Sequence, residues 1–284
     1  MEVRFFMARQ AKTQRIIDEA KDILSSFHPM TVRQVYYQLV SRQIVENNRS
    51  RYQAVSDALV DARLERIVPW DWIEDRLRLP RIYGGYSNLA QFARFAQYEY
   101  QRDAWTTQPR TVECWLEKDA LSGVFIGVIG NYRVTLNVGR GYDGWSSIRN
   151  ASERFKESGK ATIILYFGDF DPSGEDMVRS LRDRLAELDS QPEILKIALT
   201  KEDVARYNLP PNMTKSTDTR QKAFIAKHGD VSVELDALPA AILQQMIRDE
   251  IEKYVDLEAL EKIKQLETQE RKKIVEVLSA LGDS

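Results

Sequence analysis

The sequence predicts a mixed α/β protein, and three patterns along its 284 residues support this fold class. In residues 8–66, apolar side chains recur at helical spacing between short polar turns. From residue 110, short apolar runs alternate with helical patterns, which is typical of a mostly parallel sheet with crossover helices. From Pro239 onwards the pattern is helical. We therefore expect four regions: domains at 1–80 and 110–238, a linker with a helix at 81–109, and C-terminal helices at 239–284.

The first domain is predicted to hold three helices, at residues 8–24, 31–42 and 51–66. Thr31 and Gln34 have the spacing of a capping box, which marks the start of the second helix. Residues 67–73 are aromatic and are predicted to be extended. Three helices followed by an extended segment are typical of a winged-helix domain.

The third predicted helix carries a polar stripe that could enter a DNA groove. Arg49, Ser56 and Arg63 are seven residues apart, and Gln53 and Arg51 lie beside them. The first 110 residues have a positive net charge, and nearly all of their cations are arginines, which bind phosphate well. A solvated helix face would show the same pattern, so this evidence alone does not establish DNA binding.

The second domain is predicted to alternate strands and helices. The strands are expected at 111–116, 133–138, 161–167 and 194–199, and the helices near 119–129, 145–157 and 174–188. An aromatic-rich helix is expected within 78–108, and the C-terminal region is expected to form helices at 240–254 and 256–281.

Acidic side chains follow two of the predicted strands. Asp169 and Asp171 come after the apolar run 162–167, and Glu117 follows the strand 111–116. Because the carboxyl ends of parallel strands meet at one edge of a sheet, these side chains are predicted to lie together. One Glu and two Asp can hold Mg²⁺ and leave a group for proton transfer. Alternatively, Glu117 stabilises the start of its helix.

A glycine-rich turn, Gly139-Arg140-Gly141-Tyr142, follows another predicted strand. Glycines permit close backbone approach, and Arg140 is a candidate phosphate ligand. A simple turn would contain the same residues.

Composition excludes several classes of protein. No run of 18 apolar residues appears, and the N-terminus lacks the apolar core of a secretory signal. Cys114 is the single cysteine, which excludes an internal disulfide and indicates a packed small side chain. With only His28 and His228 besides it, a zinc site built from His and Cys is not expected. We expect a cytoplasmic protein.

The order of these motifs resembles the Toprim domain: strand and Glu117-Lys-Asp, then the Gly139 turn, then strand and Asp169-Phe-Asp171-Pro-x-Gly. With a winged helix before it, the chain is similar to the A subunit of topoisomerase VI and the meiotic double-strand-break protein, over about residues 28–255. The catalytic tyrosine of that family lies in a motif similar to Val32-Arg-Gln-Val-Tyr-Tyr37.

Helix geometry separates the two tyrosines of this motif. Tyr36 falls on the inner face of the predicted helix, whereas Tyr37 is predicted to be exposed, one turn from Arg33. A nearby cation favours the phenolate form that attacks a phosphodiester. The family motif also points to Tyr37. An ordinary surface tyrosine is the alternative.

The resemblance implies Mg²⁺-dependent cleavage of double-stranded DNA, with Mn²⁺ as a substitute. Tyr37 of one protomer in a dimer would act at the metal site of the other and leave a 5′-phosphotyrosyl end. It implies Glu117 as acid, base or metal ligand, Asp169 and Asp171 as metal ligands, and Glu234, in Glu234-Leu-Asp-Ala-Leu-Pro239, as a possible support. It also implies a nucleoid-associated protein.

The sequence departs from that family in lacking the length of the A subunit, and it contains no Gly-x-x-x-x-Gly-Lys ATPase loop. A separate ATPase subunit would be needed for strand passage. A hydrolytic Toprim nuclease that does not use the tyrosine, with DNA or RNA as substrate, is therefore an alternative. Two further alternatives are a non-catalytic DNA-binding assembly protein and a haloacid-dehalogenase-like phosphatase, which also has Asp-x-Asp after a buried strand.

Overall fold

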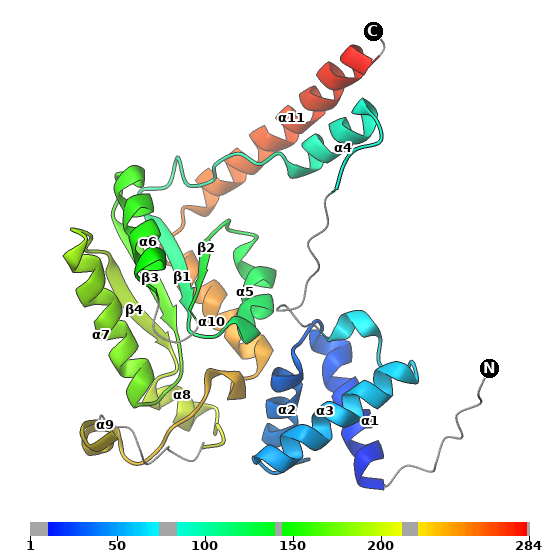
Figure 1. Ribbon diagram of the computed structural model, residues 1–284. Helices are drawn as coiled ribbons and strands as arrows, with labels where there is room; N and C mark the ends of the chain where they lie inside the picture. Colours follow the sequence, from blue (N-terminus) through cyan, green and yellow to red (C-terminus); the bar gives the residue numbers. More distant parts are fainter. Residues whose placement is uncertain (1–10, 74–83, 140–143, 212–220, 283–284) are drawn as a thin grey trace.

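The computed structural model describes residues 11–73, 84–139, 144–211 and 221–282. A sheet of four parallel strands lies at its centre, in the order β2-β1-β3-β4 (Figure 1). The strands are β1 (Thr111–Leu116), β2 (Thr135–Val138), β3 (Thr162–Phe167) and β4 (Glu193–Ala198). The predicted mixed α/β class is confirmed, and each strand lies within two residues of its expected bounds.

Helices cover both faces of this sheet. On one face, α6 (Trp145–Ser158) and α7 (Pro172–Glu187) pack on Trp115 and Tyr166. On the other face, α5 (Ser122–Ile129) and α10 (Ala240–Glu252) belong to the larger core, which includes Cys114. The central strands β1 and β3 are therefore buried on both sides, as their continuous apolar sequences predict.

Three N-terminal helices pack together beside the sheet: α1 (Ala11–Phe27), α2 (Val32–Ser41) and α3 (Arg49–Leu64). The predicted capping box of Thr31 and Gln34 is present at the start of α2. The segment predicted to be extended instead contains a 3₁₀ turn, η1 (Trp70–Trp72). The prediction was therefore partly wrong. The Trp72 ring stacks on His28, with 4.6 Å between the ring centroids, and this contact bends the segment towards the end of α1.

Helices α4 (Leu89–Glu99) and α11 (Leu257–Gly282) pack side by side and project from the rest of the molecule (Figure 1). The buried carboxylate of Glu267 holds the base of this pair. It accepts hydrogen bonds from both terminal nitrogens of Arg133, at 2.6 and 2.8 Å, and from the backbone N–H of Arg102 at 2.8 Å. Within the described residues, no helix is both long enough and apolar enough to cross a membrane.

The segment after β4 returns the chain to the carboxyl end of the sheet. It contains α8 (Lys201–Arg206), α9 (Gln221–His228) and η3 (Leu235–Ala237). Phe170 and Val233 form an antiparallel bridge with two backbone hydrogen bonds of 2.9 Å. This bridge places η3 beside the ends of β1 and β3, close to η2 (Asp119–Leu121) and against α2.

Candidate functional site

Glu117 lies at the carboxyl end of β1 and joins it to the end of β3. Its Oε2 atom accepts a hydrogen bond from the backbone N–H of Asp169 at 2.9 Å. Gly168 permits this contact, because a Cβ atom there would lie 2.7 Å from Oε2. Burial, followed by the negative charge of Asp169, raises the pKa of Glu117 to about 7. The carboxyl group can therefore bind or release a proton near neutral pH.

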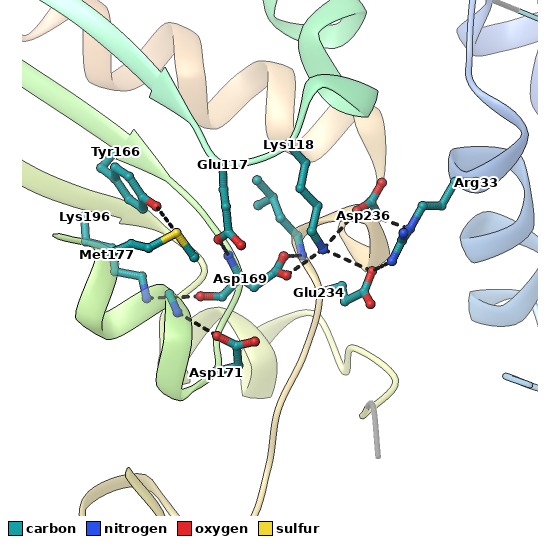
Figure 2. A network of polar contacts seen from close by, with 12 residues as sticks. Arg33, Glu117, Lys118, Tyr166, Asp169, Asp171, Met177, Lys196, Glu234 and Asp236 are labelled. Carbon is teal, nitrogen blue, oxygen red and sulfur yellow. Dashed lines mark hydrogen bonds and ion pairs between the residues drawn. The ribbon is translucent and has the colours of Figure 1, made fainter. Parts of the chain in front are cut away.

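Asp169 follows β3 and is buried (Figure 2). Its Oδ1 atom accepts a hydrogen bond from the backbone N–H of Leu235 at 2.9 Å, and its Oδ2 atom lies 2.5 Å from Nζ of Lys118. Burial raises the pKa of Asp169, and the positive charge of Lys118 opposes that rise. The structure thus brings Glu117 and Asp169 together, as their positions after parallel strands predict.

Asp171 lies at the same edge but caps helix α7. Its Oδ1 atom accepts a hydrogen bond from the backbone N–H of Gly174 at 2.6 Å. Gly174 is required here, since a Cβ atom would lie 2.3 Å from the backbone oxygen of Asp169. Lys196 also reaches this backbone oxygen, at 3.2 Å. Asp171 is therefore near Asp169 in the fold, and its role as a metal ligand stays a prediction.

Lys118 is the cation at the centre of the acidic side chains, and the sequence analysis did not identify it. Besides Asp169, its Nζ atom lies 3.2 Å from Oε2 of Glu234 and 3.8 Å from Oδ2 of Asp236. These contacts raise the pKa of Lys118, although burial opposes the rise. We name Asp169, Glu234, Asp236 and Lys118 the acidic cluster. The sequence signal for Lys118 at the site was its position directly after Glu117.

Asp236 is the second residue that the sequence analysis missed. Its side chain is 0% exposed, and neither carboxylate oxygen has a hydrogen-bond partner among the described residues. Burial raises the pKa of Asp236 to about 6. A charged residue flanked by Leu235, Ala237 and Leu238 was the sequence signal that this carboxylate would be buried. A buried carboxylate without a hydrogen bond raises the free energy of the folded state unless a bound ion or water molecule pairs with it.

Helix α2 brings Arg33 and Tyr37 to the acidic cluster. Arg33 donates a hydrogen bond to Oε2 of Glu234, and its Nε atom lies 3.8 Å from Oδ2 of Asp236. The guanidinium carbon lies 5.8 Å from the centroid of the Tyr37 ring. The predicted pairing of Tyr37 with a cation is therefore present (Figure 2 shows Arg33 with both carboxylates).

The prediction that Tyr37 is exposed was wrong, because its side chain is only 6% exposed. The helical periodicity of α2 reveals one packing face, which lies against α1 and α3. In the structure, η3 also packs against α2, and Tyr37 is buried. Burial, followed by the negative charge of Glu234, raises the pKa of Tyr37 to about 12. The phenolate is therefore disfavoured in this arrangement.

Tyr36 lies in the core, as predicted. Its hydroxyl oxygen lies 3.1 Å from both the side-chain oxygen of Asn47 and the backbone oxygen of Asn48, which share its single proton. The ring packs edge-on against Tyr52. Tyr36 therefore holds the turn between α2 and α3 and has a structural role.

The polar stripe of α3 is divided in the structure. Arg49, Arg51 and Gln53 are exposed, whereas Ser56 and Arg63 are half-buried. Arg63 lies 4.9 Å from the Trp70 ring centroid and donates a hydrogen bond to a backbone oxygen of its own helix. The N-terminal end of the stripe is therefore open to solvent, and its DNA-binding role stays a prediction. Arg140 lies outside the described residues.

The acidic side chains fit a hard divalent cation by their chemistry. Within the described ranges, no three Asp, Glu, His or Cys side chains are arranged to hold a metal ion as they stand. The ammonium of Lys118 lies between the carboxylates that would otherwise converge. The unsatisfied oxygens of Asp236 and the excess of carboxylates over cations leave negative charge that Mg²⁺ would balance.

No family model matches the chain, and no curated protein matches it either.

Proposed function

We propose that this protein makes Mg²⁺-dependent breaks in double-stranded DNA, as a short relative of the topoisomerase VI A subunit. One observation carries the proposal: a tyrosine-bearing helix packs against the buried carboxylates at the carboxyl edge of a parallel sheet. In this reading residues 1–80 are a winged-helix domain and residues 110–238 are a Toprim domain. The sheet and its acidic edge support the second assignment, and the three helices support the first.

Asp169 and Asp171 are the residues that would hold Mg²⁺ in this proposal, which leaves Glu117 for proton transfer. When bound, Mg²⁺ supplies stabilisation of the negative charge that develops on a phosphate undergoing substitution. Lys118 neutralises part of the remaining negative charge, so that a DNA phosphate can approach an otherwise repulsive surface. The exposed arginines at the start of α3 would hold the DNA backbone.

Tyr37 is the proposed nucleophile. Its phenolic oxygen forms a bond to phosphorus while the bond from phosphorus to the 3′ oxygen breaks, which leaves a 5′-phosphotyrosyl end and a 3′ hydroxyl. Glu117 accepts the phenolic proton and returns a proton to the leaving oxygen, because its pKa of about 7 suits both steps. Arg33 lies beside the ring, where its charge favours the phenolate.

A hydrolytic nuclease is the second candidate, and the burial of Tyr37 favours it. With a pKa of about 12 the phenol is a poor nucleophile in the described arrangement. In this reading a water molecule attacks phosphorus, Glu117 accepts its proton, and the products are a phosphate end and a hydroxyl end. The acidic edge would be needed in both reactions, whereas Tyr37 would be needed in only one.

The experiment that separates these candidates uses end-labelled linear DNA and supercoiled DNA, with Mg²⁺ or Mn²⁺. After denaturation, label that co-migrates with the protein reports a covalent intermediate. We expect Tyr37→Phe to abolish both the label and the scission, while the matched variant Tyr36→Phe retains them. Scission without label, unchanged in Tyr37→Phe, would establish the hydrolytic nuclease.

A double-strand break needs two nucleophiles, so we propose a homodimer as the active form, with a separate ATPase subunit for any strand passage. Light scattering on DNA-bound protein tests the dimer. Absence of scission under every condition, in protein that binds DNA, would contradict the proposed activity of this chain by itself.

A further inference from the structure

The strongest unexplained feature of the molecule is the contact that Arg33 makes across the two halves of the chain. Arg33 belongs to α2, and its partners Glu234 and Asp236 flank or lie within η3, some 200 residues later. The Oε2 atom of Glu234 accepts hydrogen bonds from both Arg33 and Lys118. We name the contact of Arg33 with Glu234 and Asp236 the Arg33 latch.

The latch closes over Tyr37. The ring is 6% exposed beneath the guanidinium, while the Arg33 side chain itself stays 41% exposed. A tyrosine that is only 6% exposed offers little surface for contact with a DNA phosphate. The described arrangement therefore assembles the tyrosine and the carboxylates but keeps the tyrosine from any large substrate.

We propose that the Arg33 latch is an autoinhibitory contact, and that a divalent cation entering the acidic cluster opens it. Arg33 uses carboxylate oxygens that hard cations also prefer. The three carboxylates of the cluster lie within 3.8 Å of Lys118, and Asp236 has no hydrogen bond to lose. Asp169 belongs both to the proposed Mg²⁺ site and to the acidic cluster. A divalent cation that binds Asp169 takes the place of Lys118 Nζ, which lies 2.5 Å from its Oδ2 atom, and draws Glu234 and Asp236 away from Arg33. Helix α2 then separates from η3, and Tyr37 becomes accessible.

The importance of the latch for cleavage rests on the proposed function, whereas its opening is measurable without DNA. Permanent docking of α2 on η3 is the competing explanation, in which Arg33 only stabilises the fold. The two explanations differ in one observable, which is the accessibility of Tyr37 when a divalent cation is added.

Nitration of tyrosines with tetranitromethane, mapped by mass spectrometry, measures this accessibility in the full chain. Two other tyrosines serve as internal standards: Tyr98 is 75% exposed and Tyr36 is 3% exposed. The test variant is Arg33→Gln. The matched control is Arg42→Gln, because Arg42 follows the same helix but pairs with Asp22 of α1, at 2.6 Å.

We expect Arg33→Gln to raise the nitration rate of Tyr37 about tenfold, which is the effect of losing one charge-assisted hydrogen bond. This gain in accessibility outweighs the loss of the Arg33 charge, which by itself disfavours the phenolate and would slow nitration. Tyr36 stays protected, which shows that the helices remain folded, and Arg42→Gln matches the wild type. Millimolar Mg²⁺ raises the Tyr37 rate in the wild type and has no further effect in Arg33→Gln. Nitration of Tyr98 is unchanged by Mg²⁺.

Equal rates of Tyr37 nitration in the wild type and Arg33→Gln would contradict the proposed latch. A wild-type Tyr37 rate that does not change when Mg²⁺ is added would contradict it too. Loss of Tyr36 protection in Arg33→Gln would show a purely structural role and would also overturn it. A protein that opens but does not cut DNA contradicts the proposed function alone. If the protein cuts DNA but Mg²⁺ does not change the nitration rate of Tyr37, only the proposed latch is contradicted.

Discussion

Glu113 and Glu117 are both buried carboxylates of the β1 region, but their charges are balanced differently. Glu113 accepts two hydrogen bonds from Arg154, at 3.0 and 3.1 Å. It also accepts one from Asn137 at 2.5 Å and one from the indole N–H of Trp115 at 3.1 Å. Its negative charge is fully compensated by groups that are fixed in the fold.

Glu117 has the backbone N–H of Asp169 as its described donor, and its nearest charged neighbours include another carboxylate. Its pKa is raised to about 7, and that of the nearby Asp236 to about 6. Glu113 is fully paired, whereas Glu117 and Asp236 at the sheet edge are left short of partners. This difference, rather than burial, distinguishes the candidate site from the core.

The largest effect is expected for chemistry at the sheet edge. Glu117→Gln should lower the rate of DNA scission about 1000-fold, because an amide cannot transfer the proton. DNA affinity should be unchanged in a filter-binding measurement. Glu113→Gln is the matched control and should cut within tenfold of the wild type. Retained cutting in Glu117→Gln would remove this residue from the site.

For the stability of the fold, Glu113 should be the more important of the two residues. Glu113→Ala should lower the free energy of unfolding by about 3 kcal/mol, because it leaves Arg154, Asn137 and Trp115 without their acceptor. Urea unfolding at pH 7 measures the change. Arg149→Ala, which removes an exposed pair with Glu153, should cost less than about 0.5 kcal/mol. Equal losses in the two variants would mean that the Glu113 cluster is not structural.

The pH dependence of stability provides a finer test of Glu117. Because its pKa in the folded state is raised to about 7 from an ordinary value of 4.5, the folded state binds the proton more tightly. The stability contributed by this group is present below pH 4.5 and is lost as the pH rises to 7. Glu117→Gln should therefore be more stable than the wild type by about 3 kcal/mol at pH 8 and equal to it at pH 4.

Urea unfolding at both pH values measures this difference. A difference between Glu117→Gln and the wild type that does not change with pH would show that Glu117 is not protonated in the folded protein near neutral pH.

The smallest effect is expected on α3. Arg49→Gln should weaken DNA binding a few-fold and reduce the slope of log affinity against log salt by about one, as expected for one phosphate contact. Arg63→Gln should leave the slope nearly unchanged, since Arg63 packs on Trp70. Salt titrations of both variants compare the exposed cation with the packed one. Identical slopes would contradict a DNA-binding role for the start of α3.

Much of the fold followed from local patterns in the sequence. The capping box of Thr31 and Gln34 marked the start of α2, and continuous apolar runs marked the buried strands β1 and β3. The meeting of Glu117 with Asp169 followed from parallel topology alone. These features depend on neighbouring residues or on a single rule of sheet geometry, so one sequence suffices to predict them.

The features that escaped prediction depend on contacts between distant segments. Tyr37 is buried by η3, which no periodicity within α2 can reveal. Lys118 and Asp236 meet only because the chain returns to the sheet after β4. A helical pattern describes one packing face, and here α2 has two.

The bridge between Phe170 and Val233 has a consequence for how the protein folds. The four strands are complete at residue 198, yet Glu234 and Asp236 arrive only when this later segment has closed on the end of β3. Closing a loop of this length carries an entropic cost that local strand pairing does not. The strands are therefore synthesised before the segment that completes the acidic cluster. A fragment that ends before Val233 would lack Glu234 and Asp236, and it would also lack α10, which belongs to the core on one face of the sheet.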